Sequence, residues 1–380
     1  MEGIQDNGPK HVSSEDAWIV LNGIPHLGPI TLRRLFDRFG PDPARILQAK
    51  STELKTVEGV GGKIAESIVR WPNHFDLERE KRQLEKHQAE FIRQSDTAYP
   101  KILEEIYDPP IGLYALGSLR SFSPAIAIIG SRRTTLYGIR TAKAFAGSLA
   151  RRGICIVSGL ASGIDAAAHE GALEVGGETV AVLGNGADIV YPTENIHLFQ
   201  SIKERGCILT EFPFGYRANR QSFPMRNRIV AGMSIGILVV ETDISGGSLI
   251  TARFAGDQGR QVFAIPGRID QSTSAGCHQL IRDGATLVTS AEEIIEQLRL
   301  DELPMPTTLE IPDDGDPKLK TSSTPEETLI ENCLADGEIL HPDQIATSTG
   351  LETATVNATL MLLELRKVVR KRADGRFEKR

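Results

Sequence analysis

The sequence predicts an α/β protein with a doubly wound, mostly parallel sheet, preceded and followed by a helical domain. Between residues 125 and 298, short apolar runs alternate with helical patterns: AIAIIG, ICIVSG, TVAVLG, CILTEF, IGILVVE, QVFAIPG and ATLVTS. Strands that are apolar throughout and separated by helices are typical of parallel sheets covered on both faces. We therefore expect a Rossmann-like domain at 91–300, whose ligand binds beyond the carboxyl ends of the strands.

Size and composition fit a globular protein of two or three domains. The chain has 380 residues, of which 40% are hydrophobic and 24% charged, and its net charge is −7. No apolar run reaches 18 residues and the start of the chain is polar, so we expect a cytoplasmic protein with no membrane partner. The four cysteines form no CxxC pair, which argues against a disulfide framework or a zinc site.

Residues 1–90 are expected to form an N-terminal helical domain. The turns at 23–29 (GIPHLGP) and 57–63 (VEGVGGK) have the pattern of helix-hairpin-helix turns, whose glycines can offer backbone N–H groups to a phosphate. Tight turns between helices explain the same glycines. We slightly favour this second interpretation, because only the turn with Lys63 carries a basic residue. A helix at 74–88 and a packed connector at 99–117 are expected to follow.

The end of the chain predicts a linker at 301–325 and a winged helix at 326–380. Residues 301–327 contain five prolines, several acidic residues and few apolar ones. Helical patterns at 326–334, 342–348 and 352–365 then precede a basic hairpin that closes on Asp374-Gly375. Winged helices often place their third helix in a DNA groove, but this third helix has no lysine or arginine. Binding to DNA and binding to protein both stay open for this domain.

The first strand of the predicted sheet ends in a turn suited to phosphate. It is followed by Gly130, Ser131, Arg132 and Arg133. Glycine allows close approach of a ligand, the N–H groups of such a turn can form an anion nest, and arginine can bind phosphate through two hydrogen bonds. An arginine that only pairs with a nearby carboxylate is the alternative. We favour phosphate because the Gly-Ser turn comes directly before the arginines.

Later strand ends add further candidate residues for DNA and phosphate binding. The second strand is followed by a loop of small residues that enters a helix, and the fifth by a helix that starts with glycines. The segment after the fourth strand mixes arginine with aromatic residues, as single-strand binding surfaces do, and residues 226–228 are expected to open a helix at the same edge. The candidates are Ser158, Gly159, Gly163, Arg217, Arg220, Phe223, Arg226, Asn227, Arg228, Gly246, Gly247 and Ser248. So many phosphate-capable turns on one edge exceed what a mononucleotide needs.

Two ionisable residues follow the second strand on one face of the expected helix. Asp165 and His169 are four residues apart and could act as a base and its orienting group. No nucleophile lies beside them in a known motif. We therefore favour a structural role, in which Asp165 orders its loop and His169 packs beneath it. After the third strand, Tyr191 could stack on a base or pack against the fold.

These segments, taken in order, resemble the DNA-processing protein A family, DprA or Smf. The matching stretches are IGSRRTTLYG, SGLASGIDAAAHEGAL, AVLGNGADIVYPTEN, FPMRNRIVAG, SGGSLITARFA, GRQVFAIPG and LIRDGA, which together cover 125–288. The expected helical domain, of the SAM or helix-hairpin-helix type, and the winged helix also fit longer members. Two positions depart from the family pattern: Met225 replaces a residue that is often basic, and Thr210 replaces a serine. Met225 cannot bind phosphate as a basic residue would, and Arg217 or Arg220 could compensate.

The resemblance implies a binding protein and not an enzyme. It implies a homodimer that binds and protects single-stranded DNA and helps load the RecA recombinase during natural transformation. The sequence has no Walker motif and no metal-ligand pattern, so no cofactor is expected. The alternative is a nucleotide hydrolase of the phosphoribohydrolase (lysine decarboxylase-like) group, with Glu211, Glu241 or Asp165 as its carboxylate. Its full PGGxGTxxE signature is missing. A dinucleotide-dependent oxidoreductase fits less well, because the first turn lacks GxGxxG.

Overall fold

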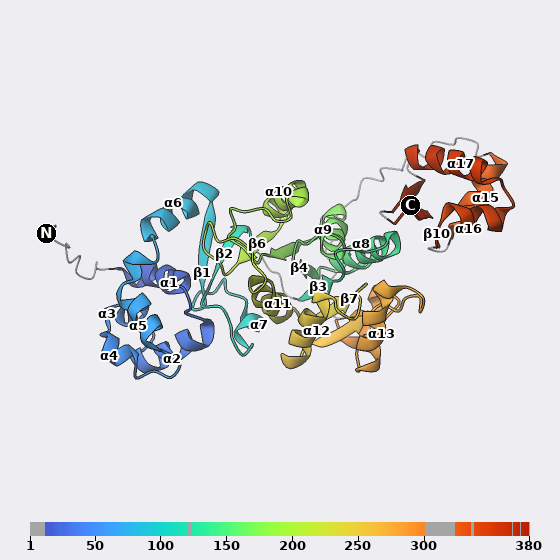
Figure 1. Ribbon diagram of the computed structural model, residues 1–380. Helices are drawn as coiled ribbons and strands as arrows, with labels where there is room; N and C mark the ends of the chain where they lie inside the picture. Colours follow the sequence, from blue (N-terminus) through green and yellow to red (C-terminus); the bar gives the residue numbers. More distant parts are fainter. Residues whose placement is uncertain are drawn as a thin grey trace. The chain divides into compact units, whose positions relative to one another are not determined.

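The structure is a computed structural model that describes residues 12–119, 124–300, 324–335, 338–366, 368–372 and 374–379. Of the predicted linker at 301–325, the described ranges include residues 324 and 325. The rest of the linker lies outside them. The described residues fall into two compact units (Figure 1). The larger unit contains the N-terminal helices together with the main sheet, and the smaller one contains the C-terminal domain.

The main sheet confirms the predicted α/β class. Within the described residues it has nine strands in the order β1-β2-β6-β5-β4-β3-β7-β8-β9. Each predicted apolar run forms a strand, and all neighbours from β6 to β9 are parallel. These seven strands are β3 (Ala125–Ile129), β4 (Cys155–Ser158), β5 (Thr179–Val182), β6 (Cys207–Thr210), β7 (Gly236–Val239), β8 (Gln261–Ala264) and β9 (Thr286–Leu287).

One prediction at the edge of the sheet was wrong. Part of the expected connector at 99–117 forms strand β2 (Gly112–Gly117), which pairs antiparallel with β6 and with β1 (Ala89–Arg93). The first five residues of β2 are buried, so its packing resembles that of the central strands. Strand β1 was missed because the polar residues Glu90 and Arg93 interrupt its apolar pattern.

The strand order reverses direction next to β3, which lies between β4 and β7. Helices cover both faces of the sheet, with α8, α9 and α10 on one face and α11, α12 and α13 on the other (Figure 1). Their bounds are α8 (Leu136–Arg151), α9 (Ile164–Glu174), α10 (Ile196–Arg205), α11 (Ser222–Gly232), α12 (Gly247–Asp257) and α13 (Ala275–Arg282), with α7 (Lys101–Glu104) before them and α14 (Ala291–Gln297) after them. In doubly wound sheets this reversal marks the ligand crevice.

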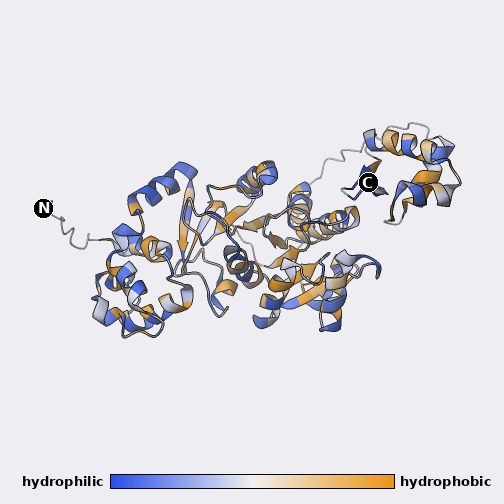
Figure 2. Cartoon of the chain, viewed as in Figure 1, coloured by the Kyte–Doolittle hydropathy of each residue, from blue (hydrophilic) through white to orange (hydrophobic). Residues whose placement is uncertain are grey.

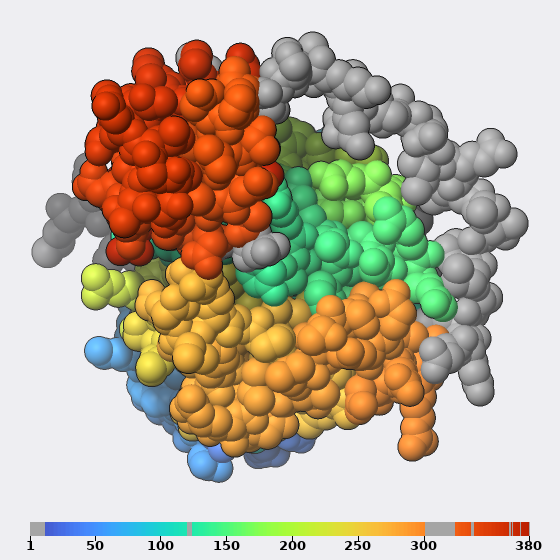
Figure 3. Space-filling view, turned by 90° about the vertical axis from the view of Figure 1, so that its right-hand side faces the viewer, coloured from blue at the N-terminus to red at the C-terminus, as the bar shows by residue number. Residues whose placement is uncertain are grey.

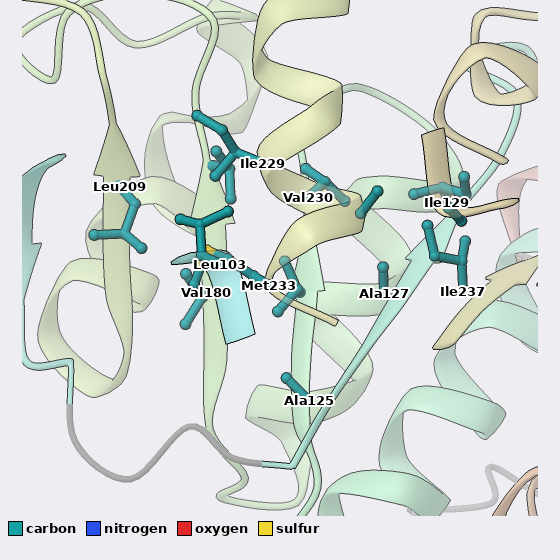
Figure 4. Packing of buried hydrophobic residues seen from close by; sticks show 14 of the residues in the cluster. Leu103, Ala125, Ala127, Ile129, Val180, Leu209, Ile229, Val230, Met233 and Ile237 are labelled. Atoms are coloured by element: carbon teal, nitrogen blue, oxygen red, sulfur yellow. The ribbon is translucent and has the colours of Figure 1, made fainter. Parts of the chain in front are cut away.

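Helix α11 is held against the sheet by an apolar core. Figure 4 shows Ile229 and Val230 of this helix, and Met233 at its C-cap, in one apolar cluster with Ala125, Ala127 and Ile129 of β3. The aliphatic members of this cluster are almost fully removed from water, and burial of each large side chain contributes about 1.5–3 kcal/mol. This packing fixes α11 over the middle of the sheet, with its N-terminal end at the carboxyl edge.

The N-terminal residues form helices around a core of their own. The helices are α1 (Ser14–Gly23), α2 (Pro29–Phe39), α3 (Pro43–Gln48), α4 (Ser51–Leu54), α5 (Gly62–Val69) and α6 (Leu77–His87). The two glycine-rich turns join α1 to α2 and α4 to α5, as predicted. Figure 2 shows that α6 is mostly hydrophilic, whereas the central strands are hydrophobic. No helix in the described ranges combines the length and apolar character needed to cross a lipid bilayer.

The C-terminal unit is a winged helix, as predicted. Helices α15 (Pro325–Cys333), α16 (Pro342–Thr349) and α17 (Thr353–Leu365) pack around a small core, and Figure 3 shows this domain (red) as densely packed. The hairpin consists of β11 (Val369–Lys371) and β12 (Phe377–Lys379), and β12 also pairs with β10 (Ile339–Leu340). Gly375 in the hairpin turn has a φ of +82°, which favours glycine.

Candidate nucleic-acid interface

A cavity of about 520 Å³ opens at the carboxyl edge of the main sheet. Its walls are the loops after β3, β4 and β7 together with the first turns of α11 and α12. It brings together most of the predicted site residues: Gly130, Ser131, Arg132, Arg133, Gly159, Arg220, Phe223, Arg226, Asn227, Gly246, Gly247 and Ser248. Residues chosen from separate strand ends in the sequence therefore lie around one cavity in the fold.

A second, smaller cavity of about 70 Å³ adjoins the first. The two share several lining residues, including Arg132, Gly159 and Phe223. Tyr191 lines only the smaller cavity, and its ring centroid lies 6.0 Å from that of Phe223. Tyr191 is 46% exposed, so its ring face is available for contact. Two aromatic rings at a cavity edge provide flat apolar surfaces on which a base can stack.

Four predicted residues do not line either cavity. Ser158 is buried and its hydroxyl donates to the Ile128 carbonyl, at 2.7 Å. Gly163 has a φ of +84°, and a Cβ there would lie 2.4 Å from the Ser131 carbonyl oxygen. These two residues therefore support the loops behind the site. Arg217 and Arg228 are the other two members of this group.

Arg228 is engaged in a buried ion-pair network. Its side chain is 3% exposed, and its guanidinium pairs with the carboxylates of Glu211 and Asp108. The backbone carbonyl of Glu211 also accepts a hydrogen bond from the Asn22 side chain, at 2.8 Å. Through Glu211, Arg228 thus helps to join α11 to the N-terminal helices. Arg217, in contrast, is exposed to solvent.

The turn after β3 uses its backbone groups to connect neighbouring loops. The Ser131 N–H donates to the Glu241 carbonyl at 2.6 Å, and the Ile164 N–H donates to the Ser131 carbonyl at 3.3 Å. The Arg133 N–H donates to the Ser131 hydroxyl at 3.0 Å. The N–H groups of Ser131 and Arg133 therefore do not form the expected anion nest, because neighbouring oxygens already accept from them.

The arginine side chains of this turn remain available. Arg132 is exposed, and its guanidinium carbon lies 5.0 Å from the centroid of the Phe223 ring. Such a cation–π contact contributes about 0.5–1 kcal/mol at an exposed site. Among the residues that the structure describes, no carboxylate lies within ion-pair distance of Arg132, Arg133 or Arg220. The sequence leaves open that Arg132 only pairs with a nearby carboxylate. The described residues show no such salt bridge.

Helix α12 presents its N-terminal end to the large cavity. Its N-cap residue is Gly246, and no side chain caps the helix. A Cβ on Gly247 would meet open space, whereas the Thr242 side chain lies against Gly246, so this end of the helix is open on the side of Gly247. The Ser248 hydroxyl turns inward and donates to the Thr242 hydroxyl, at 2.7 Å. First-turn N–H groups and the helix dipole favour an anion at this end.

Arg226 lies deep in the wall of the site. The sequence pattern predicts a helix that opens with Arg226, but α11 already begins at Ser222, so Arg226 is inside the helix and faces the sheet. It is 5% exposed and donates to the carbonyls of Gly159 and Val182. Its Nε also donates to the Asn227 side-chain oxygen, at 3.0 Å. Arg226 is thus placed differently from the exposed arginines.

Asp165 and His169 have the structural arrangement that we favoured. The Asp165 carboxylate accepts hydrogen bonds from the backbone N–H groups of Gly159 and Ala161. His169 is fully buried, and its Nδ1 lies 2.6 Å from the Thr179 hydroxyl. Because that hydroxyl donates to a backbone carbonyl, Nδ1 must carry the proton. Burial lowers the pKa of His169 to about 3, so the ring is neutral at physiological pH.

Several cavity-lining residues were not predicted from the sequence. Among them are Ala161 in the loop after β4, Asp243 before α12 and Thr251 one turn inside that helix. Thr251 could have been found from helical spacing, because it lies four residues after Gly247. Asp243 places a carboxylate on the cavity wall, where it accepts from the Ser245 N–H at 2.8 Å.

The terminal domains show weaker signals for nucleic acid. In the second glycine-rich turn of the N-terminal domain, Glu58 forms an ion pair with Arg34, at 3.3 Å. In the hairpin of the winged helix, Arg372 pairs with Glu378 and Lys379 pairs with Glu331. Helix α17 instead exposes Met361 and Leu362. These exposed apolar side chains and internally paired cations fit a protein surface better than a DNA surface.

Family models match all three parts of the chain. The model for DNA recombination-mediator protein A matches residues 90–299, which is more than half of the chain. A helix-hairpin-helix motif matches residues 18–79, and the DprA winged helix domain matches residues 315–375. The order of these matches follows the order of the domains described above.

Individual relatives agree with these matches. The protein Smf of Synechocystis sp. is 33% identical over 401 residues, which cover 97% of this chain and 100% of that protein. The structure of DNA processing protein A from Streptococcus pneumoniae aligns with a TM-score of 0.65 at 32% identity, over 74% of this chain and 97% of that chain.

A further structural relative comes from Helicobacter pylori. Its DNA processing protein A, whose structure concerns a mode of single-stranded DNA binding, aligns with a TM-score of 0.52 at 31% identity. The alignment covers 56% of this chain and 97% of that chain. On the family matches and the full-length similarity to Smf, this chain belongs to the DNA recombination-mediator protein A family, DprA/Smf.

Proposed function

We propose that this protein binds single-stranded DNA along the carboxyl edge of its main sheet and acts as a recombination mediator. The observation that carries the proposal is the stacking of Arg132 on Phe223 where the two cavities meet. A charge for phosphate and a ring face for a base lie there side by side. Single-strand binding sites combine these two elements and read little of the sequence.

The parts of the site divide between phosphate and base. Arg132, Arg133 and Arg220 supply positive charge and form no salt bridge within the described part of the chain, and the N-terminal end of α12 adds N–H donors. Phe223 and Tyr191 supply ring faces at the smaller cavity. A chain of phosphates can use several such groups in a row. The structure of the Helicobacter pylori relative concerns single-stranded DNA binding, which supports this class of ligand.

The role that we propose is binding and not catalysis. Two of the three carboxylates considered for a nucleotide hydrolase are already engaged: Glu211 is paired with Arg228, and Asp165 is held by backbone N–H groups. Family membership further supports a cytoplasmic homodimer, associated through the main-sheet domain, that protects its DNA and delivers it to the RecA recombinase. Binding of this kind requires no cofactor.

The direct test is the salt dependence of DNA binding by Arg132→Ala. We expect affinity for an oligothymidine to fall about tenfold, because the variant removes one charge-assisted hydrogen bond to a phosphate. The slope of log affinity against log salt, measured by fluorescence anisotropy, should fall by about 0.7, the value for one phosphate on a single strand.

A matched control is Arg253→Ala. Arg253 lies on helix α12, but its side chain is 85% exposed, pairs with Asp257 and lines neither cavity. This variant should keep the affinity and slope of the wild type. If Arg132→Ala behaves like this control, the proposed site is wrong.

A further inference from the structure

We propose that Arg226 and Asp165 are positioning residues that hold the Gly159–Ala161 loop between them, and that Arg226 contacts no phosphate. The proposal rests on the proposed function, because the loop forms a wall of the DNA site. It assigns opposite roles to two arginines, Arg132 and Arg226, that the sequence alone does not distinguish.

Arg226 connects the ends of two strands to helix α11. Its Nη1 donates to the Gly159 carbonyl, just after β4, and to the Val182 carbonyl at the end of β5. Its Nε donates to Asn227. Two of its three guanidinium nitrogens are therefore occupied. Bidentate binding of phosphate needs two adjacent free nitrogens, and only Nη2 has no acceptor among the described residues.

Asp165 holds the same loop from the other side. It lies in the first turn of α9 and accepts from the N–H groups of Gly159 and Ala161, at 3.2 and 3.4 Å. The backbone of Gly159 is thus bound at its N–H by a carboxylate and at its carbonyl by a guanidinium. The two charged side chains come from helices on opposite faces of the sheet, so the loop is fixed between α9 and α11 (Figure 1).

The two charges depend on each other because both are buried. Arg226 is 5% exposed and Asp165 is 8% exposed. Burial lowers the pKa of Arg226 and raises the pKa of Asp165, and the charge of each opposes the shift of the other. A buried charge is costly without hydrogen bonds, so each side chain is held in place by its own bonds to the loop.

The geometry leaves no room for a side chain on Gly159. A Cβ there would lie 2.2 Å from Nη1 of Arg226. Gly159 and Ala161 line both cavities, so the loop that they form borders the smaller cavity and the larger one. A displaced loop would change the shape of both cavities while leaving the number of phosphate-binding groups the same.

The test compares Arg226→Gln and Arg226→Lys by the same salt titration with oligothymidine. We expect both to bind about tenfold more weakly at every salt concentration, with the slope of the wild type. Lysine keeps the charge, but its single ammonium cannot reproduce the planar fork that reaches both carbonyls and Asn227. Circular dichroism measures the folded fraction of each variant, so the affinity refers to folded molecules only.

Gly159→Ala supplies an independent variant that keeps both charges. Its methyl group should push the guanidinium away and reduce affinity by the same factor at an unchanged slope. If Arg226→Gln does not fold, Gly159→Ala and Arg226→Lys still test whether Arg226 positions the loop.

Two results would overturn the proposal. One is a slope reduced by about 0.7 in Arg226→Gln and restored in Arg226→Lys, which would show that Arg226 binds a phosphate. The other is wild-type affinity in folded Arg226 variants. Arg132→Ala distinguishes a failure of this proposal from a failure of the proposed function. Its salt slope should fall if DNA binds at the site, whether or not Arg226 positions the loop.

Discussion

At the scale of single residues, burial separates arginines that look alike in the sequence. Arg132 and Arg220 lie at the cavity surface without carboxylate partners in the described ranges, whereas Arg226 and Arg228 are at most 5% exposed. Exposed guanidinium groups can exchange water for phosphate at little cost. Buried ones already have protein acceptors, and their removal leaves other polar groups unpaired. The number of arginines in the segment therefore overstates the number that can bind DNA.

A carboxylate on the cavity wall should limit the affinity for DNA. We predict that Asp243→Asn binds oligothymidine about two- to fivefold more tightly, because it removes one repulsive charge near the phosphates. The amide oxygen can still accept from the Ser245 N–H, so the loop should keep its shape. Fluorescence anisotropy at low salt measures the effect.

The control for this variant is Asp257→Asn, which makes the same charge change on helix α12 outside the cavities. A gain of equal size in both variants would show that net charge, and not the position of Asp243, determines the affinity.

At the scale of elements, the strands were predictable and the direction of the α11 side chains was not. Continuous apolar runs marked β3 to β9, because buried parallel strands carry few polar residues. The start of α11 was misplaced, so Arg226 was expected at its exposed beginning. With the helix starting at Ser222, helical spacing puts Arg226 on the same stripe as Val230 and Met233, which face the core.

The hydrogen bonds of Arg226 could not have been predicted in the same way. They depend on which strand ends lie next to each other, and this order follows from the crossover between β6 and β7 and not from local patterns. The hydrogen bond of the Ser131 N–H was equally unpredictable, because its acceptor, the Glu241 carbonyl, follows β7.

The winged helix should contribute little to single-strand binding. We predict that Arg370→Ala combined with Arg376→Ala leaves the affinity and the salt slope for oligothymidine unchanged. Helix α17 carries no basic residue over 353–365, and the hairpin residues Arg372 and Lys379 are already paired with carboxylates. The salt titration used for Arg132→Ala measures this.

A slope reduced by more than the value for one phosphate in this double variant would contradict the prediction. It would place part of the DNA on the hairpin of the winged helix.

At the scale of the whole molecule, the larger unit combines a rigid sheet with a site formed by its loops. The Glu80 carboxylate accepts from the Phe214 N–H at 2.9 Å, and Asn22 bonds to Glu211, so the N-terminal helices support the segment that leads into α11. This support reaches the site through α11, which carries Phe223 and Arg226. The site thus depends on interactions between parts of the chain that are far apart in the sequence.

The most direct measurement is a crystal structure of the protein with a short oligothymidine. We predict phosphates beside Arg132, Arg220 and the N-terminal end of α12, a base against Phe223, and Arg226 still bound to the carbonyls of Gly159 and Val182. DNA bound only at the glycine-rich turns of the N-terminal helices or at the winged helix, with no nucleotide at the carboxyl edge of the main sheet, would contradict the proposed binding site.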